Sequence, residues 1–143
     1  MAEIDVALRI PNVLIDRARA LVEPVGSDLE VAIFGRVKLV WVLKLAALRG
    51  AQELARRSSL AGGIVKPLLV YRLPVRSGSR RFTMRLPRAF VGDMDELART
   101  TTRDMEFQQF YGHKTTNRST MFRYLVHLGL PVLERSYLTH QDW

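Results

Sequence analysis

Cysteine is absent from the 143 residues of this chain, which excludes disulfide bonds, thiolate metal sites and cysteine nucleophiles. No apolar run approaches the roughly 18 residues that a membrane-spanning helix needs, so we expect no membrane partner. The first residues lack the basic and apolar segments of a signal peptide. We therefore expect a cytoplasmic protein.

Catalytic and metal-binding motifs are also missing. His113, His127 and His140 lack the spacing of metal ligands, and no phosphate-binding loop, glycine-rich dinucleotide turn or nucleophile elbow occurs. We expect no enzyme, no cofactor and no metal. The chain does contain 48% hydrophobic and 25% charged residues, a balance typical of a globular protein, and its length predicts one domain over residues 1–143.

Charge is distributed unevenly along the chain. The 22 Lys+Arg and 14 Asp+Glu residues give a net charge of +8, which suits a polyanionic partner. Residues 61–92 hold 7 basic and no acidic residues, whereas the segments on either side are nearly balanced. The alternative explanation for such a run is a solvated basic linker.

A short pattern occurs twice. VALRIP at residues 6–11 matches FTMRLP at residues 82–87 in its order of apolar, small, apolar, arginine, apolar and proline residues. Both segments alternate with period two and end at a proline, which cannot donate a ladder hydrogen bond. Each therefore predicts a short strand.

After each proline the apolar period changes to that of an amphipathic helix. The first predicted helix ends at Pro24, and its apolar stripe consists of Val13, Leu14, Ala18, Leu21 and Val22. The second has the stripe Phe90, Val91, Met94, Leu97 and Ala98, with Asp93, Asp95 and Glu96 expected to face solvent.

A further helix follows in each half. Residues 27–30 form a capping-box pattern, after which apolar residues continue from Leu39 to Leu54, with Gly35 and Gly50 as weak points and Trp41 expected in the core. Residues 116–120 supply cap candidates for the other helix, which we expect to break or kink near Gly129 and Pro131. Leu39 aligns with Met121, so the two copies are 82 residues apart at these helices, whereas they are 76 residues apart at the strands. The second copy therefore contains about six extra residues, in or near residues 104–115.

The order strand, helix, helix, repeated in one chain, resembles the ribbon-helix-helix family of DNA-binding proteins. Residues 81–87 look like the strand of Arc-type repressors, and NRSTMFRYL at residues 117–125 is similar to the start of that family's second helix. The resemblance implies a mainly α fold with a short two-stranded antiparallel β-ribbon. It also implies a tandem ribbon-helix-helix pseudo-dimer, with units at about residues 4–57 and 81–138 joined by a connector at residues 58–80.

This resemblance implies double-stranded DNA as the partner, because a two-stranded ribbon fits the major groove. Strand alternation then places one set of side chains toward the base edges if Phe82, Met84 and Leu86 face the core. The predicted base-contacting residues are Arg81, Thr83 and Arg85 in one strand and Asp5, Ala7 and Arg9 in the other. For Asp5, repulsion of phosphate and acceptance of a hydrogen bond from cytosine both remain open.

Phosphate contacts are expected where helix N-termini point backbone N–H groups outward. The predicted phosphate-contacting residues are Thr116, Asn117, Arg118, Ser119, Gly35, Arg36, Lys38, Arg80 and Arg88, with Arg76 as a further flanking cation. Residues 68–74, which end in Arg-Leu-Pro, predict either an extra strand or a competitor for the groove position.

The resemblance leaves the biological role open. It implies sequence-specific binding by a transcriptional regulator, or by an accessory factor of conjugative or T-DNA transfer, which single-chain tandem members resemble. The alternative is a protein-interaction module of the same fold, antitoxin-like or a partition adaptor. The pseudo-dimer implies a monomer, and both self-association on DNA and a partner protein in a transfer complex remain open.

Overall fold

The computed structural model describes residues 3–27, 37–61, 78–105 and 117–138. Helices dominate, and the elements in chain order are β1 (Glu3–Pro11), α1 (Asn12–Ala20), α2 (Val22–Gly26), α4 (Leu39–Ala61), β2 (Ser79–Pro87), α6 (Arg88–Arg103) and α8 (Arg118–Tyr137). The strands β1 and β2 form a two-stranded antiparallel sheet. A mainly α fold with a two-stranded antiparallel ribbon is thus confirmed.

The ribbon joins two segments that lie far apart in the sequence. Its register pairs Val6 with Met84, Ala7 with Thr83 and Leu8 with Phe82. Burial alternates along both strands, so that Val6, Leu8, Met84 and Leu86 are buried while the residues between them are exposed. This alternation follows from the two-residue period of a strand, which sends successive side chains to opposite faces.

A proline ends each strand and opens the helix behind it. Pro11 and Pro87 have φ angles of -59° and -55° and stand directly before α1 and α6. Proline fits this boundary because its fixed φ suits the entry to a helix and its missing N–H costs no helical hydrogen bond there. The predicted strand-to-helix junctions are therefore confirmed.

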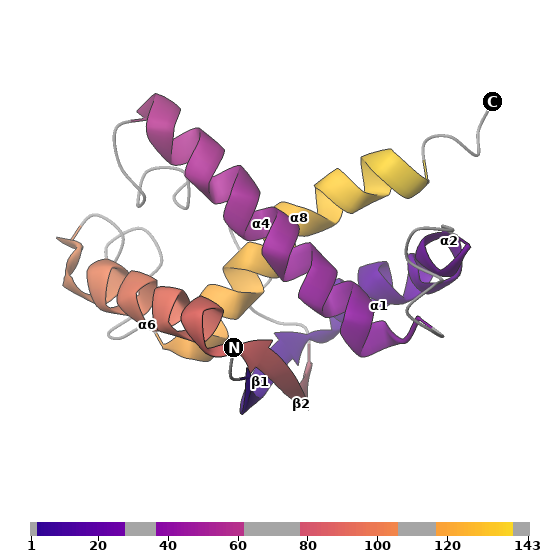
Figure 1. Cartoon of the computed structure of the whole chain (residues 1–143), viewed down its shortest axis with the longest axis horizontal. Helices are drawn as coiled ribbons and strands as arrows, with labels where there is room; N and C mark the ends of the chain where they lie inside the picture. The colour runs from indigo at the N-terminus through magenta and orange to yellow at the C-terminus, as the bar shows by residue number, and fades with distance from the viewer. Residues whose placement is uncertain (1–2, 28–36, 62–77, 106–116, 139–143) are drawn as a thin grey trace.

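The longest helices, α4 and α8, cross at the centre of the molecule, with α1 and α6 on opposite sides of the crossing (Figure 1). Gly50 of α4 lies against the backbone of Leu125, and Gly129 of α8 lies against the backbone of Ala46. The sequence predicts a weak point at Gly50 and a break or kink near Gly129, and in the structure both glycines allow the two helix backbones to approach each other. α8 also continues unbroken through Pro131 to Tyr137.

The core fills the space between the ribbon and the helices. Leu14 and Ala18 of α1 and Met94 and Leu97 of α6 are buried, as the helical stripes predict. Two expectations are wrong: Val13 is 36% exposed, and Trp41 on α4 is 41% exposed rather than in the core.

The connection between α1 and α4 differs from the prediction. Pro24 does not end the first helical segment but lies inside the short helix α2, in its first turn, where proline is tolerated. Ser27 stands at the C-terminal end of α2, and its backbone N–H and hydroxyl both donate to the carbonyl of Glu23. Val37 and Lys38 are not helical, so α4 begins at Leu39 rather than near residue 30.

Several expectations fall outside the described residues. They are the extra strand at residues 68–74, most of the insertion at residues 104–115, and the capping box beyond Ser27.

Candidate nucleic-acid interface

The outer face of the ribbon carries every residue that the sequence predicts to contact bases. Asp5, Ala7 and Arg9 of β1 and Arg81, Thr83 and Arg85 of β2 are all exposed. The register places Ala7 opposite Thr83 at the middle of this face. An arginine pair lies on one side of this middle position and a mixed-charge pair on the other.

The mixed-charge pair is formed by Asp5 and Arg85, which are directly opposite each other. The Nε of Arg85 donates to Oδ1 of Asp5 over 3.2 Å. Both side chains are about two-thirds exposed, at 67% and 65%, so water screens the attraction strongly. The pair makes this end of the ribbon locally neutral without removing its hydrogen-bonding groups.

At the other end Arg9 lies opposite Arg81, and two positive charges meet. Nη1 of Arg9 donates to the hydroxyl of Ser79 over 3.2 Å. Among the described residues neither arginine forms an ion pair with a carboxylate. Like charges directly opposite are unfavourable in a sheet, so this pair gains from an anion that binds between its members.

The N-terminus of α8 is docked against this arginine end. Asn117 caps the helix, since its Oδ1 accepts from the backbone N–H of Thr120 over 3.0 Å and from the Thr120 hydroxyl over 3.1 Å. The Ser119 hydroxyl accepts from the backbone N–H of Arg9 over 3.3 Å. This bond fixes the helix terminus, with its partial positive charge, beside β1.

A hollow of about 320 Å³ separates the ribbon from the helix end, and we call it the arginine hollow. Its lining consists of Ala7, Leu8, Arg9, Arg81, Asn117, Ser119 and Arg123. Three of these residues are arginines and none is acidic. The described part of the chain thus places an anion-attracting depression next to the outer face of the ribbon.

Arg123 is a site residue that the sequence reasoning missed. It lies four residues after Ser119, so both occupy one side of α8, and its Nε donates to the Ser119 carbonyl over 3.4 Å. Burial lowers the pKa of Arg123 from its ordinary value. The helical spacing from the predicted cap was the signal that could have identified it.

The remaining predicted phosphate contacts are less concentrated. Arg118 points away to α6, where its Nε and Nη2 donate to the two carboxylate oxygens of Asp95 over 2.9 and 2.8 Å. These hydrogen bonds lower the pKa of Asp95, and the prediction that Asp95 faces solvent is wrong because the pair is only about one-third exposed. Lys38 and Arg88 are exposed near the starts of α4 and α6.

Arg80 occupies the ribbon face opposite to Arg81. Its guanidinium carbon lies 5.4 Å from the centre of the Phe82 ring, two residues further along the same face. It therefore flanks the core side of the ribbon and is separate from the outer set. Thr116, Gly35, Arg36 and Arg76 lie outside the described residues.

The described residues also bear on metal binding and membrane insertion. No group of three or more His, Asp or Glu side chains there is placed to hold a metal ion. No helix among the described residues has the length and apolar character to cross a membrane. Comparison of the chain with protein-family models, curated proteins and solved structures finds no match.

Proposed function

We propose that this chain binds double-stranded DNA by inserting the β1-β2 ribbon into the major groove. The observation that carries the proposal is a two-stranded ribbon whose outer face exposes Arg9, Arg81 and Arg85 beside a capped helix N-terminus. The major groove admits a ribbon of this width and presents guanine O6 and N7, which arginine binds with two hydrogen bonds. Both α4 and α8 begin on the ribbon side of the molecule and run away from it (Figure 1), so both helix dipoles favour an anion on that side.

The proposal includes a tandem ribbon-helix-helix architecture, with the repeated units at about residues 4–57 and 81–138. It is supported by the pairing of Ala7 with Thr83, which are equivalent positions of the repeated strand pattern and lie where a local two-fold axis would pass. The crossing helices support it as well. Gly50 contacts the Leu125 carbonyl and Gly129 contacts the Ala46 carbonyl, a reciprocal arrangement that fits an offset of 79 rather than the 82 expected from the sequence.

The two ends of the ribbon would then contact DNA unequally. The arginine end combines Arg9 and Arg81 with Arg123, whereas Asp5 offsets Arg85 at the other end. Asp5 can accept a hydrogen bond from cytosine N4 while Arg85 donates to guanine, an arrangement that suits a C·G pair. The Asp5 carboxylate would also repel a phosphate. An asymmetric duplex site is therefore expected.

Two biological uses fit this proposal, transcriptional regulation and an accessory role in conjugative or T-DNA transfer. They differ in where the preferred site lies, since a regulator binds at a promoter and a transfer factor binds beside a nick site. Mapping the selected sequence distinguishes them.

The test begins with selection of duplexes from a random pool at physiological salt. Binding of the selected duplex is then compared for Arg9→Ala/Arg81→Ala and for Arg19→Ala/Arg99→Ala, a control that removes the same charge from later turns of α1 and α6. We expect the ribbon variant to lose at least about thirtyfold in affinity, because each good bidentate base contact contributes about 1–3 kcal/mol. The control should keep its sequence preference.

Asp5→Asn provides a second comparison at the opposite end of the ribbon. We expect about threefold tighter binding, because the amide oxygen of the variant can still accept from cytosine N4, while loss of the negative charge frees Arg85 and ends any repulsion of phosphate. Equal losses in the ribbon and control variants, or failure to select any duplex, would refute the proposal.

A further inference from the structure

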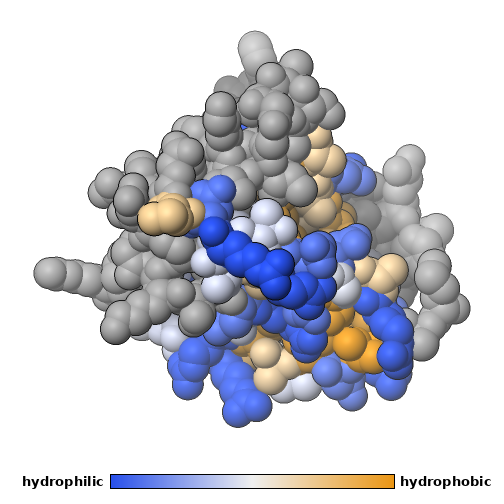
Figure 2. Space-filling view, turned by 90° about the vertical axis from the view of Figure 1, so that its left-hand side faces the viewer, coloured by the Kyte–Doolittle hydropathy of each residue, from blue (hydrophilic) through white to orange (hydrophobic). Residues whose placement is uncertain are grey.

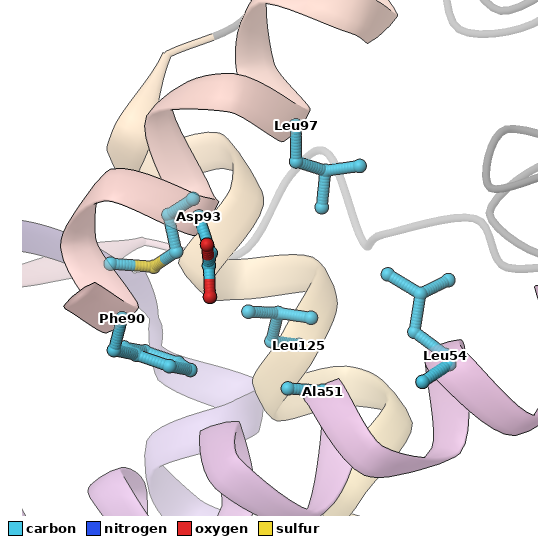
Figure 3. Close-up of a pocket in the computed structure, with 8 residues that line it drawn as sticks. Ala51, Leu54, Phe90, Asp93, Leu97 and Leu125 are labelled. Atoms are coloured by element: carbon cyan, nitrogen blue, oxygen red, sulfur yellow. The ribbon is translucent and has the colours of Figure 1, made fainter.

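A groove opens on the side of the molecule where α6 lies, and none of its described lining residues belongs to the ribbon. It has a volume of about 330 Å³ and lies between α4, α6 and α8 (Figure 3). The apolar lining consists of Ala51, Leu54, Ala55, Phe90, Met94, Leu97 and Leu125. The space-filling view of this side shows hydrophobic areas emerging between hydrophilic side chains (Figure 2).

The corresponding space on the other side of the helix crossing is bridged by an ion pair. There Arg17 of α1 donates through Nε to Oε2 of Glu134 on α8 over 3.1 Å, and both side chains are about two-thirds buried. The positions of this pair can be compared with the other side of the crossing. Arg17 is the sixth residue after Pro11, the proline before α1, and Glu134 is the fifth after Gly129, the glycine of α8 at the crossing.

The equivalent positions on the groove side, counted from the proline before α6 and from the crossing glycine of α4, hold different residues. The sixth residue after Pro87 is Asp93, and the fifth after Gly50 is Ala55, and both line the groove. An alanine cannot bridge to α6, so among the described residues no ion pair joins these two positions. Among the described residues α6 packs mainly on α8 and makes few contacts with α4, which leaves the groove between them.

Among the described residues that line the groove, Asp93 alone carries a charge. Its carboxylate points toward the space above Leu125 (Figure 3). It forms no ion pair with another described residue. A single carboxylate at the edge of an apolar groove selects for a cation attached to an apolar body.

We infer that the groove binds a small hydrophobic amine, with the ammonium on Asp93 and the apolar body against Phe90, Leu54 and Leu125. The volume suits a compound of about ten to fifteen heavy atoms, at the small end of ligand sites. The inference does not depend on DNA binding, because the groove shares no residue with the arginine hollow.

The test measures binding of three matched probes to the full chain by titration of NMR chemical shifts. The probes are 4-phenylbutylamine, 4-phenylbutan-1-ol and 4-phenylbutyrate, which share an apolar body and differ in head-group charge. We expect the amine to bind at least about fivefold more tightly than the alcohol, and the carboxylate to bind most weakly. The shifts should centre on residues of α6 and the second half of α4.

Two test variants and one control variant separate the parts of the inference. Asp93→Asn should abolish the preference for the amine, whereas Glu96→Gln, an acid of α6 outside the groove, should leave it unchanged. Ala55→Glu/Asp93→Arg copies the ion pair of the other side and should remove binding of all three probes, while its circular dichroism and thermal unfolding show that it folds.

Three binding results would overturn the inference: equal binding of amine and carboxylate, unchanged amine binding in Ala55→Glu/Asp93→Arg, or absence of saturable binding. A dimer in sedimentation experiments that Ala55→Glu/Asp93→Arg disrupts would also overturn it, because the groove would then bind a second copy of the chain.

Discussion

The contact between α4 and α8 permits a quantitative test of the fold through Gly129→Ala. A Cβ atom added to Gly129 would lie 1.7 Å from the carbonyl oxygen of Ala46 and 2.7 Å from the backbone nitrogen of Gly50. Real Cβ atoms essentially never come closer than 3.0 Å, so the helices must separate by more than 1 Å. Both sides of the contact are helical backbone, which cannot move aside as a flexible side chain does.

This separation weakens the most extensive helix contact of the described structure. Val42, Leu43 and Ala46 of α4 and Phe122 of α8 are completely buried near the crossing. A gap of 0.5–1 Å loses roughly a quarter to a half of each dispersion contact, and overpacking of a core typically costs about 1–3 kcal/mol. Alanine gains about 1 kcal/mol over glycine in helix propensity. Because the clash is between two helix backbones, we expect the cost at the upper end of this range, and hence a net loss of about 2 kcal/mol in the free energy of unfolding.

Gly92→Ala is a matched control for this substitution. Gly92 also lies inside a helix, α6, but a Cβ there meets nothing within 4 Å. The control should gain about 0.5–1 kcal/mol in stability, because helix propensity is the sole effect. Urea denaturation followed by circular dichroism measures both variants against the parent protein.

The reciprocal contact at Gly50 extends the test. A Cβ on Gly50 would lie 1.7 Å from the Leu125 carbonyl oxygen, so Gly50→Ala should be as destabilising as Gly129→Ala. The double variant should lose less than the sum of the two, because one separation of the helices relieves both clashes. A Gly129→Ala protein as stable as the parent would refute the close helix crossing, and strict additivity would refute the shared separation.

Two further predictions concern ionisable side chains. Asp95→Asn should lower the free energy of unfolding by about 1 kcal/mol, after allowance for solvent screening, because it removes the charge from the pair that joins α6 to α8. A double-mutant cycle with Arg118→Gln, measured by denaturant unfolding, should give a coupling energy that falls in 1 M salt. A coupling energy of zero would contradict this prediction. Burial lowers the pKa of His127 below its usual 6.5, and the nearby charge of Arg17 is a smaller cause. Because the unfolded chain therefore binds the proton more readily than the folded protein, the free energy of unfolding should fall as pH drops below 6.5 toward the lowered pKa. His127→Gln should flatten the change in urea midpoint between pH 7.5 and 5.5, and an unaltered slope would show that other groups cause it.

Features encoded within a few neighbouring residues could be read from the chain alone. Period-two alternation and the closing prolines predicted both strands and their solvent-facing residues, because strand pleating and the missing proline N–H act locally. A helix cap within residues 116–120 and most of the buried stripe of α6 were predicted for the same reason. The start of α4 at Leu39 was not, since Val37 and Lys38 directly before it are not helical.

Features that join distant segments required the tertiary structure. Asp5 and Arg85 are 80 positions apart, and no local pattern indicates that their strands align in the register that pairs them. The bonds from Arg118 to Asp95 and from the Arg9 N–H to Ser119 likewise depend on how helices pack on the ribbon.

Gly50 and Gly129 illustrate the difference most clearly. Helix propensity, a local quantity, marks both as weak points, yet the crossing of α4 and α8 makes them the positions where a side chain cannot fit. The amino-acid sequence by itself therefore determined which side chains the two strands present to solvent. The packing of the elements decided which charges are neutralised, which are left exposed on the ribbon, and where the groove stays open, because those outcomes depend on distances between backbones rather than on neighbours along the chain.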